Sequence, residues 1–347
     1  MRWKFRTLAV VVALVLVAGQ FAYWRIAAER VRAGYKNWLG ALVASGWTVS
    51  SASPSIGGWP RAAVVSVPNL TLRHVGPTVP GDVEVVSAGM ALSVTLLSPA
   101  TLRISVTGPT HVRMGAMQDL VVTSAKNWAL LPLQPEGPLQ ADFYASGLRI
   151  EPATGAWHAT AGLLNGHATI AEAPPADASE PGGKLWLSAE AIALPTVINW
   201  PLGPNISSLS LDGVLNGPVP QVRDITAWAE AWRDGGGSLA ISHLALGWGP
   251  LGLTSSATLA LDDQLQPMGS GNGRIVGYAA TLDRLAAAGM LSKSAATAAK
   301  AVLSLMAGSG DSNEPSAVDV PLTLQYRTLS MRQVPLIRLP ELDWPAR

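Results

Sequence analysis

The chain contains 347 residues, of which 48% are hydrophobic and only 14% are charged, and its formal net charge is +1. This composition excludes an intrinsically disordered chain, and the near-zero charge excludes a strong electrostatic attraction to nucleic acid. The sequence has no cysteine, so disulfides, thiolate metal sites and cysteine nucleophiles are excluded as well.

The amino terminus has the pattern of a membrane anchor. Residues 1–6 are rich in arginine and lysine, and the run Thr7–Trp24 that follows carries no charge. As a helix, residues 7–24 extend for about 27 Å, close to the thickness of the hydrocarbon core of a bilayer. The basic flank predicts a cytoplasmic stub at 1–6 and a single-pass inner-membrane protein with most of its chain in the periplasm. The alternative is a cleaved secretion signal, because small residues occupy Val17–Gly19.

An amphipathic helix is predicted over residues 25–45, in continuity with the apolar run. This continuity argues against cleavage, and Gly46 is a suitable residue to end the helix. The helix is expected either to lie along the membrane surface or to pack on the following sheet, and packing is preferred. Its apolar residues recur at steps of three and four, at Trp24, Ala27, Ala28, Val31, Tyr35, Trp38, Leu39 and Leu42.

Residues 46–217 are predicted to form an N-terminal β region, because short alternating runs are separated by Pro and Gly at intervals of about ten residues. The stretch 171–183 is acidic and rich in proline, so it is expected to be an exposed loop and a candidate subdomain boundary. The expected strands are Trp47–Ser51, Arg61–Val67, Leu70–Arg73, Val83–Ser87, Ala91–Leu97, Thr101–Val106, Thr110–Met114, Leu120–Ser124, Ala141–Glu151, Ala156–Ile170, Lys184–Leu194 and Leu209–Leu215.

Residues 218–347 are predicted to form a C-terminal β region that also contains helices. Asp224 is placed to cap the first helix, and the run Leu251–Asp262 alternates apolar and polar residues as a half-buried strand does. The expected helices are 221–234, Thr281–Met290 and Ser292–Met306, and the expected strands are Ser238–Trp248, Leu251–Asp262, Gly273–Tyr278, Ala317–Tyr326 and Leu329–Arg332.

The predicted fold class is therefore mainly β. The strands are expected to form a large antiparallel meander sheet, either one curved sheet or a sandwich-like arrangement. An N-terminal transmembrane helix precedes this sheet, and the C-terminal helical pair at 281–306 is expected to pack on it.

A series of short motifs built from Gly, Pro and aromatic residues recurs along the chain beyond the anchor. The motifs are Gly57-Gly58-Trp59-Pro60-Arg61, Trp232…Gly236-Gly237-Ser238, Leu246-Gly247-Trp248-Gly249-Pro250, Leu259-Ala260-Leu261-Asp262, Gln266-Pro267 and Leu285…Gly289. In order and spacing they resemble the bacterial family called domain of unknown function 2125, over most of the chain beyond the anchor. Gly58-Trp59-Pro60 stands where that family usually has a Gly-Phe-Pro-like element, which keeps an aromatic ring before a proline.

The resemblance implies an exported β-rich protein anchored in the inner membrane, with no assigned activity, cofactor or site residue. The architecture, an anchor followed by a long antiparallel sheet, is more loosely similar to that of AsmA-like envelope proteins. Those proteins are associated with phospholipid movement, and this second likeness is one of fold alone.

No catalytic, cofactor-binding or metal site is predicted, and the chain is not expected to be an enzyme. Asp262 and Asp263 are adjacent, so a turn explains them better than a shared substrate atom does. His243 lies within an apolar run, where a hydrogen bond inside the sheet is expected. The histidines form no pair with metal-ligand spacing, and they are His74, His111, His158, His167 and His243.

Tryptophan is unusually abundant, with 13 residues against 3 phenylalanines. These side chains are interpreted either as part of the core or as an apolar ligand surface for acyl chains or sugars. The candidate surface consists of Trp128, Trp157, Trp186, Trp200, Trp228, Trp232 and Trp248.

The leading hypothesis for function is a non-catalytic membrane-anchored protein that binds phospholipid or another apolar envelope component in a hydrophobic concavity. The strands carry apolar side chains of both parities, so both faces of the sheet are expected to need cover, from the helical pair or a bound acyl chain. One alternative is a structural assembly partner of another envelope protein. A second alternative is an envelope polysaccharide hydrolase, which would require convergent carboxylates or a Ser/His pair in a cleft.

Overall fold

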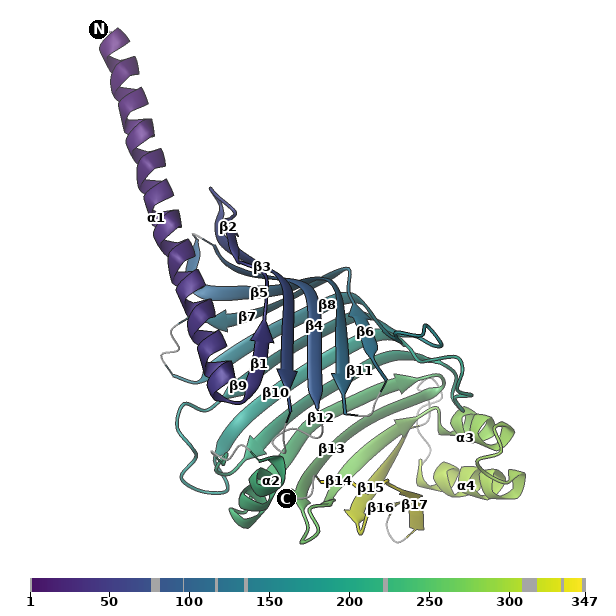
Figure 1. Cartoon of the computed structure of the whole chain (residues 1–347). Helices are drawn as coiled ribbons and strands as arrows, with labels where there is room; N and C mark the ends of the chain where they lie inside the picture. Colours follow the sequence, from purple (N-terminus) through teal and green to yellow (C-terminus); the bar gives the residue numbers. More distant parts are fainter. Residues whose placement is uncertain are drawn as a thin grey trace.

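The computed structural model describes residues 2–75, 82–95, 97–115, 118–133, 137–220, 224–307, 317–331 and 334–344. These residues form one long helix, α1 (Arg2–Ala44), one large antiparallel sheet and the short helices α2 to α4 (Figure 1). The fold class is therefore mainly β, as the sequence predicts.

A single sheet contains every strand from β1 to β17. β3, β4 and β5 pair in succession, β6 and β7 share the position between β5 and β8, and from β8 onward each strand pairs with the next. β1 and β2 both pair with β3. The first strands are β1 (Trp47–Ser50), β2 (Ser55–Gly57), β3 (Ala62–His74), β4 (Val83–Thr95), β5 (Ser98–Met114), β6 (Leu120–Thr123), β7 (Lys126–Pro132) and β8 (Leu139–Pro152). The others are β9 (Ala159–Ile170), β10 (Pro181–Ala193), β11 (Asn205–Asn216), β12 (Ser238–Trp248), β13 (Leu251–Leu261), β14 (Pro267–Val276), β15 (Ala317–Gln325), β16 (Thr328–Met331) and β17 (Val334–Arg338).

The sheet is one curved layer that folds over itself. β3, β4 and β5 run across the top of the view and then turn downward, and the strands from β8 to β14 continue behind and below them (Figure 1). A line of residues with positive φ crosses the strands, at Asn69 (52°), Gly108 (72°), Gly147 (57°) and Ala191 (51°). The strand pairing places them in neighbouring register, so we call this line the crease. A left-handed residue interrupts the pleat and bends a strand, so the crease accounts for the turn.

The crease also explains an error in the predicted strands. The sequence predicts two short strands in each of three places, and each place holds one long strand instead, namely β3, β4 or β5. Asn69 in β3 and Gly108 in β5 reverse the alternation of apolar residues, so each half resembles a separate strand. β2, β7 and β17 are not predicted. The predicted start of β14 at Gly273 is too late, because the Pro and Gly residues at the true start, from Pro267 onward, resemble a turn in the sequence.

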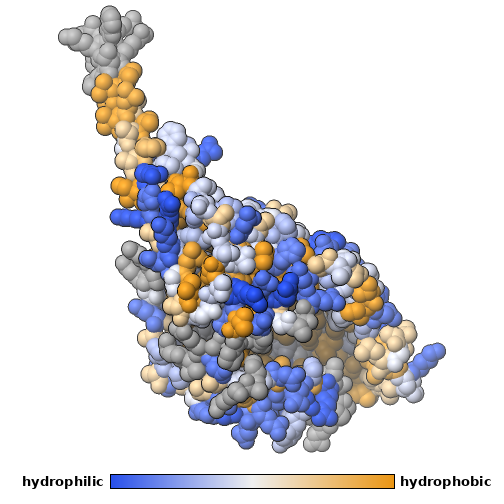
Figure 2. Space-filling view, viewed as in Figure 1, coloured by the Kyte–Doolittle hydropathy of each residue, from blue (hydrophilic) through white to orange (hydrophobic). Residues whose placement is uncertain are grey.

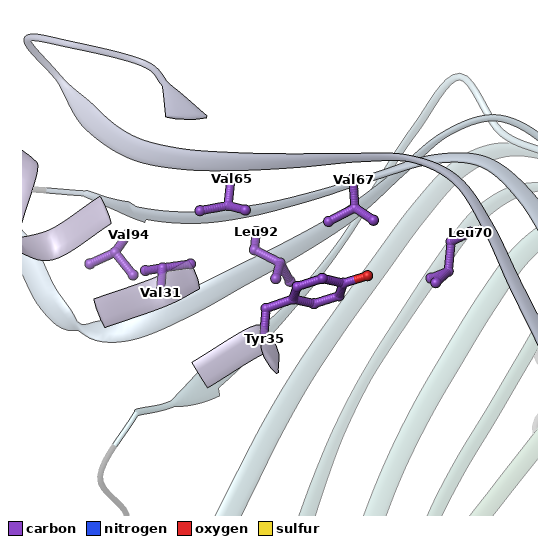
Figure 3. Close-up of a cluster of buried hydrophobic side chains, with 7 residues drawn as sticks. All are labelled: Val31, Tyr35, Val65, Val67, Leu70, Leu92 and Val94. Carbon is purple, nitrogen blue, oxygen red and sulfur yellow. The ribbon is translucent and has the colours of Figure 1, made fainter. Parts of the chain in front are cut away.

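Helix α1 is continuous from the apolar run into the predicted amphipathic segment and ends before Gly46, as predicted. Trp24, Ala28, Val31 and Tyr35 are buried against the sheet, so the packing alternative is confirmed over a position along the membrane surface. Figure 3 shows Val31 and Tyr35 beside the side chains that project from β3 and β4.

The first half of α1 projects from the sheet (Figure 1). By its length and composition α1 is a candidate membrane span, and a signal sequence near the amino terminus would satisfy the same criterion.

Three short helices, α2, α3 and α4, lie between strands in the second half of the chain. The α2 helix (Ile225–Asp234) begins at Asp224, whose carboxylate accepts a hydrogen bond from the Ala227 amide, and residues 221–223 of the predicted helix lie outside the described ranges. The predicted helical pair is confirmed as α3 (Tyr278–Ala287) and α4 (Lys293–Met306). It packs on β15 around Tyr278, Val318 and Val320, with Leu303 and Met306 from α4.

The sheet continues through both predicted boundaries. The loop after β9 joins it to β10, and these two strands pair with each other. β11 and β12 also pair, although α2 lies between them in sequence. Hydrogen bonding between strands thus connects the two predicted β regions, 46–217 and 218–347.

Candidate functional site

One row of paired residues crosses the sheet from the strand under α1 to the strand under α4. Directly paired residues project from the same face of a sheet, so the members of the row share one face. We call this set the apolar row because Ser255 is its only polar member among these described positions. It consists of Val65, Leu92, Ile104, Ala129, Phe143, Gly166, Leu187, Leu211, Leu244, Ser255, Gly273 and Val320.

Neighbouring rows on this face have the same character. One runs through Ala145, Leu164, Ala189, Leu209, Leu246, Leu253, Ile275 and Val318. Another runs through Leu139, Ile170, Gly183, Leu215, Leu239, Leu259, Gly269, Leu324 and Leu329. Together these rows form a broad surface that we call the apolar face.

The opposite face of the same strands is polar. Between the two neighbouring rows just described, a row on this face contains Asp142, His167, Trp186, Asp212 and His243. The expectation that strands are apolar on both faces is therefore wrong for this part of the sheet. At the crease and at the bulge in β12, the apolar side chains change from odd-numbered to even-numbered residues or the reverse. In the sequence, this change looks like a strand that is apolar on both faces.

The bulge in β12 keeps its apolar residues on one face. Leu239 and Ile241 have odd numbers and Leu244 and Leu246 have even numbers, so a regular strand would separate them. The register shifts between Ile241 and Leu244 against β13, and the extra residue restores the alignment. His243 lies in this bulge with an exposed side chain, opposite Asp212, and not in the apolar environment that its neighbours in sequence suggest.

The apolar face is covered at its ends, and between them its leucine side chains are only partly buried. Val65 is fully buried under α1, and Val320 is 1% exposed under α4. In the central strands Leu187 and Leu211 are only half-buried, and Leu185 is 39% exposed. In the space-filling view, apolar surface lies in the recess beside α3 and α4 (Figure 2).

Two cavities lie along the inner side of the bent strands. One of about 310 Å³ lies between α1 and strands β4, β5 and β7. A second, of about 340 Å³, lies at the crease between β5, β6, β7 and β8. A third hollow, of about 530 Å³, crosses β11 to β15 and is lined by a mixture of polar Ser, Thr and Asn residues and apolar residues.

The tryptophans of the predicted ligand surface are dispersed. Trp128 stacks on Tyr144, with ring centroids 5.5 Å apart, and Trp228 stacks on Trp232 in α2. Trp200 and Trp248 meet edge to face, with centroids 6.1 Å apart, and each donates its indole N–H to a backbone carbonyl.

Trp186 lies on the polar face of β10, and Trp157 lies in the loop between β8 and β9. Aliphatic side chains make up most of the apolar face, and a ligand-binding role for the tryptophans stays a prediction. The alternation of aliphatic residues along each strand is the signal that would have found this face.

One polar cluster contains a carboxylate, an imidazole and a hydroxyl in sequence, which is the arrangement of a hydrolase catalytic triad. His167 Nδ1 lies 2.7 Å from Asp142 Oδ1, and its Nε2 lies 3.1 Å from Thr169 Oγ1. Both His167 and Asp142 are well exposed on the polar face, at 41% and 51%. Within the described ranges no group of three or more His, Asp or Glu residues is placed to hold a metal ion.

Among the described residues, two side chains have displaced pKa values, and both lie outside the apolar face. Hydrogen bonds from the hydroxyl and amide of Ser179 lower the pKa of Asp177. A hydrogen bond to Asp234 raises the pKa of Arg233.

Comparison with known proteins gives one match. No curated protein and no solved structure matches the chain. One family model, described as "Uncharacterized protein conserved in bacteria (DUF2125)", matches residues 24–340, which extend from the packed part of α1 to the end of the sheet. The chain therefore belongs to the DUF2125 family of bacterial proteins.

Proposed function

We propose that the chain is a non-catalytic, membrane-anchored protein of the bacterial envelope that binds acyl chains of lipid on its apolar face. Residues 7–24 would hold it in the inner membrane, with the sheet in the periplasm. The observation that carries the proposal is the apolar row, which runs without a charged residue from α1 to α4 and is half-buried in its middle.

Physical chemistry supports a bound apolar ligand. Exposed contiguous apolar surface is unfavourable in water by about 25 cal/mol per Å², so soluble domains rarely leave it uncovered. The ligand surfaces of proteins are concave and mostly apolar, which fits the curvature of this sheet. The polar opposite face needs no such cover and is suited to water.

The assembly-partner and hydrolase alternatives make different demands on the molecule. A partner protein would cover the apolar face with its own side chains, and the test below would reveal it as a protein that co-purifies in place of lipid. A hydrolase needs a substrate cleft, whereas the Asp142–His167–Thr169 cluster lies on the exposed polar face of the strands. The apolar face therefore favours binding over hydrolysis.

The test is lipid analysis of the full-length chain purified from membranes in mild detergent, by native mass spectrometry. We expect bound phospholipid, and we expect the double variant Leu187→Gln/Leu211→Gln to lose most of it. The matched control is Ser188→Gln/Ser210→Gln, which places the same side chains on the polar face of the same strands. Equal lipid content in both variants, or a co-purifying protein in place of lipid, would contradict the proposal.

A further inference from the structure

The cavity under α1 is positioned at the membrane end of the apolar face. Val31 and Tyr35 of α1 and Leu92 and Ile104 of the sheet line it, and the last two belong to the apolar row. Its volume of about 310 Å³ is near the lower end for ligand pockets, roughly 300–1,000 Å³. That volume suits one acyl chain better than the two chains of a whole phospholipid.

A glycine of α1 keeps this cavity open. Gly34 lines the cavity, and a Cβ at this position would meet no atom within 4 Å. Glycine inside a helix is destabilising relative to alanine, and no neighbouring atom approaches closely enough to require it here, so close packing does not explain its presence. Any larger side chain at Gly34 would project into the space that the cavity occupies.

The level of the membrane relative to the cavity follows from contacts of α1. Trp59, 47% exposed at the tip between β2 and β3, lies beside Phe21 with ring centroids 6.4 Å apart. Gln20 donates a hydrogen bond to the carbonyl of Pro60 in the same tip. Exposed aromatic residues at the end of an apolar helix are typical of the membrane interface, so the tip marks that level.

A cationic side chain lies at the cavity about 9 Å beyond Trp24 along the helix. Arg30 lines the cavity and is exposed, and it forms no ion pair with any residue in the described ranges. Arg25, by contrast, is paired with Glu29 at 3.0 Å. If residues 7–24 cross the hydrocarbon core, Arg30 lies at the depth of lipid headgroups, where a guanidinium binds phosphate well.

We propose that the cavity under α1 accepts one acyl chain of an anionic phospholipid from the membrane in which α1 is anchored, with the phosphate at Arg30. The cavity is then the portal through which acyl chains reach the apolar row. This inference rests on the proposed lipid-binding function and adds to it the class of lipid and the point of access.

The test uses the full-length chain in phosphatidylethanolamine vesicles that contain phosphatidylglycerol with a photoreactive group at the end of one acyl chain. Mass spectrometry after irradiation locates labelled peptides. We expect label both in strands β4 to β7 and in strands β10 and β11. Gly34→Leu should fill the cavity and reduce both signals about tenfold, whereas Gly40→Leu, where a Cβ also meets nothing, should leave them unchanged.

Arg30→Gln tests the headgroup. It should lower the preference for photoreactive phosphatidylglycerol over photoreactive phosphatidylethanolamine by about fivefold, the effect of about 1 kcal/mol per basic residue. Arg25→Gln removes the same charge away from the cavity and should preserve the preference. Equal labelling by photoreactive free fatty acid, unaffected by Arg30→Gln, would overturn the assignment to phospholipid.

The outcomes separate the two proposals. Label in β10 and β11 that persists in Gly34→Leu would overturn the portal and leave lipid binding by the apolar face intact. Absence of label from both regions of the wild-type chain would overturn both.

Discussion

The two ends of the apolar row differ from its middle, although the residues are of the same kind. Val65 and Val320 are buried under α1 and α4, whereas Leu187 and Leu211, between the helices, are half-buried. Alternating aliphatic residues thus give a strand an apolar surface, but another element must pack on that surface to bury it. α1 and α4 pack on the two ends of the apolar row. We propose that the ligand covers its middle.

The largest expected effect is that of a charge at the covered end. Val65→Asp would bury a carboxylate without a partner, so we expect a loss of more than about 4 kcal/mol in the free energy of unfolding. Ser66→Asp, on the exposed side of the same strand, should change it by less than about 0.5 kcal/mol. Denaturant unfolding in detergent measures both, and similar losses would remove the distinction between the two faces.

Truncating one side chain at an end and one in the middle of the apolar row should give a smaller difference in the free energy of unfolding. Val320→Ala removes methyl groups from a buried position and should cost about 2 kcal/mol. Leu211→Ala removes a larger but half-exposed group, so in the delipidated chain we expect about 1 kcal/mol. The same unfolding assay compares them, and a greater loss from Leu211→Ala would show that the middle of the row is already covered in the protein alone.

A smaller effect is expected at the contact that orients α1. Trp24 Nε1 donates hydrogen bonds to the carbonyl oxygens of Ala62 at 2.9 Å and Gly57 at 3.3 Å. Trp24→Phe keeps most of the ring volume and removes these bonds, so we expect a loss of about 1 kcal/mol. Faster hydrogen exchange in β2 and the start of β3 would report it. Trp59→Phe is the control, and an equal effect from that exposed ring would refute the role of the bonds.

Local sequence patterns predict much of the fold. The apolar periodicity of α1 continues past Trp24 and gives both the length of the helix and the face that packs. β12 and β13 end at turns with clear Gly, Pro or Asp signals, so their predicted bounds are nearly those observed. The cap at Asp224 is confirmed for the same reason, because capping depends on residues close in sequence.

Features that depend on distant residues are not predicted. The crease passes through Asn69 and Ala191, and neither residue type alone indicates a left-handed conformation inside a strand. The apolar row depends on register between strands far apart in the chain, so no single segment contains it. Alternation within a strand indicates that the strand has an apolar face, but the residues that line up across strands become visible only when the pairing is known. The tryptophans, the most conspicuous residues in the sequence, are dispersed around this site.

From β8 onward every strand pairs with its neighbour in sequence. Most of these strands follow their partner after a short connection, although α2 precedes β12 and the α3 and α4 pair precedes β15. Where the connection is short, only a small loop closes before the new strand gains hydrogen bonds, so the entropic barrier to adding it is small. The sheet can grow in the order of synthesis, one strand at a time, from a template that α1 has already stabilised. The same connectivity allows related chains to gain or lose a hairpin at the distal edge without disturbing the strands beside α1.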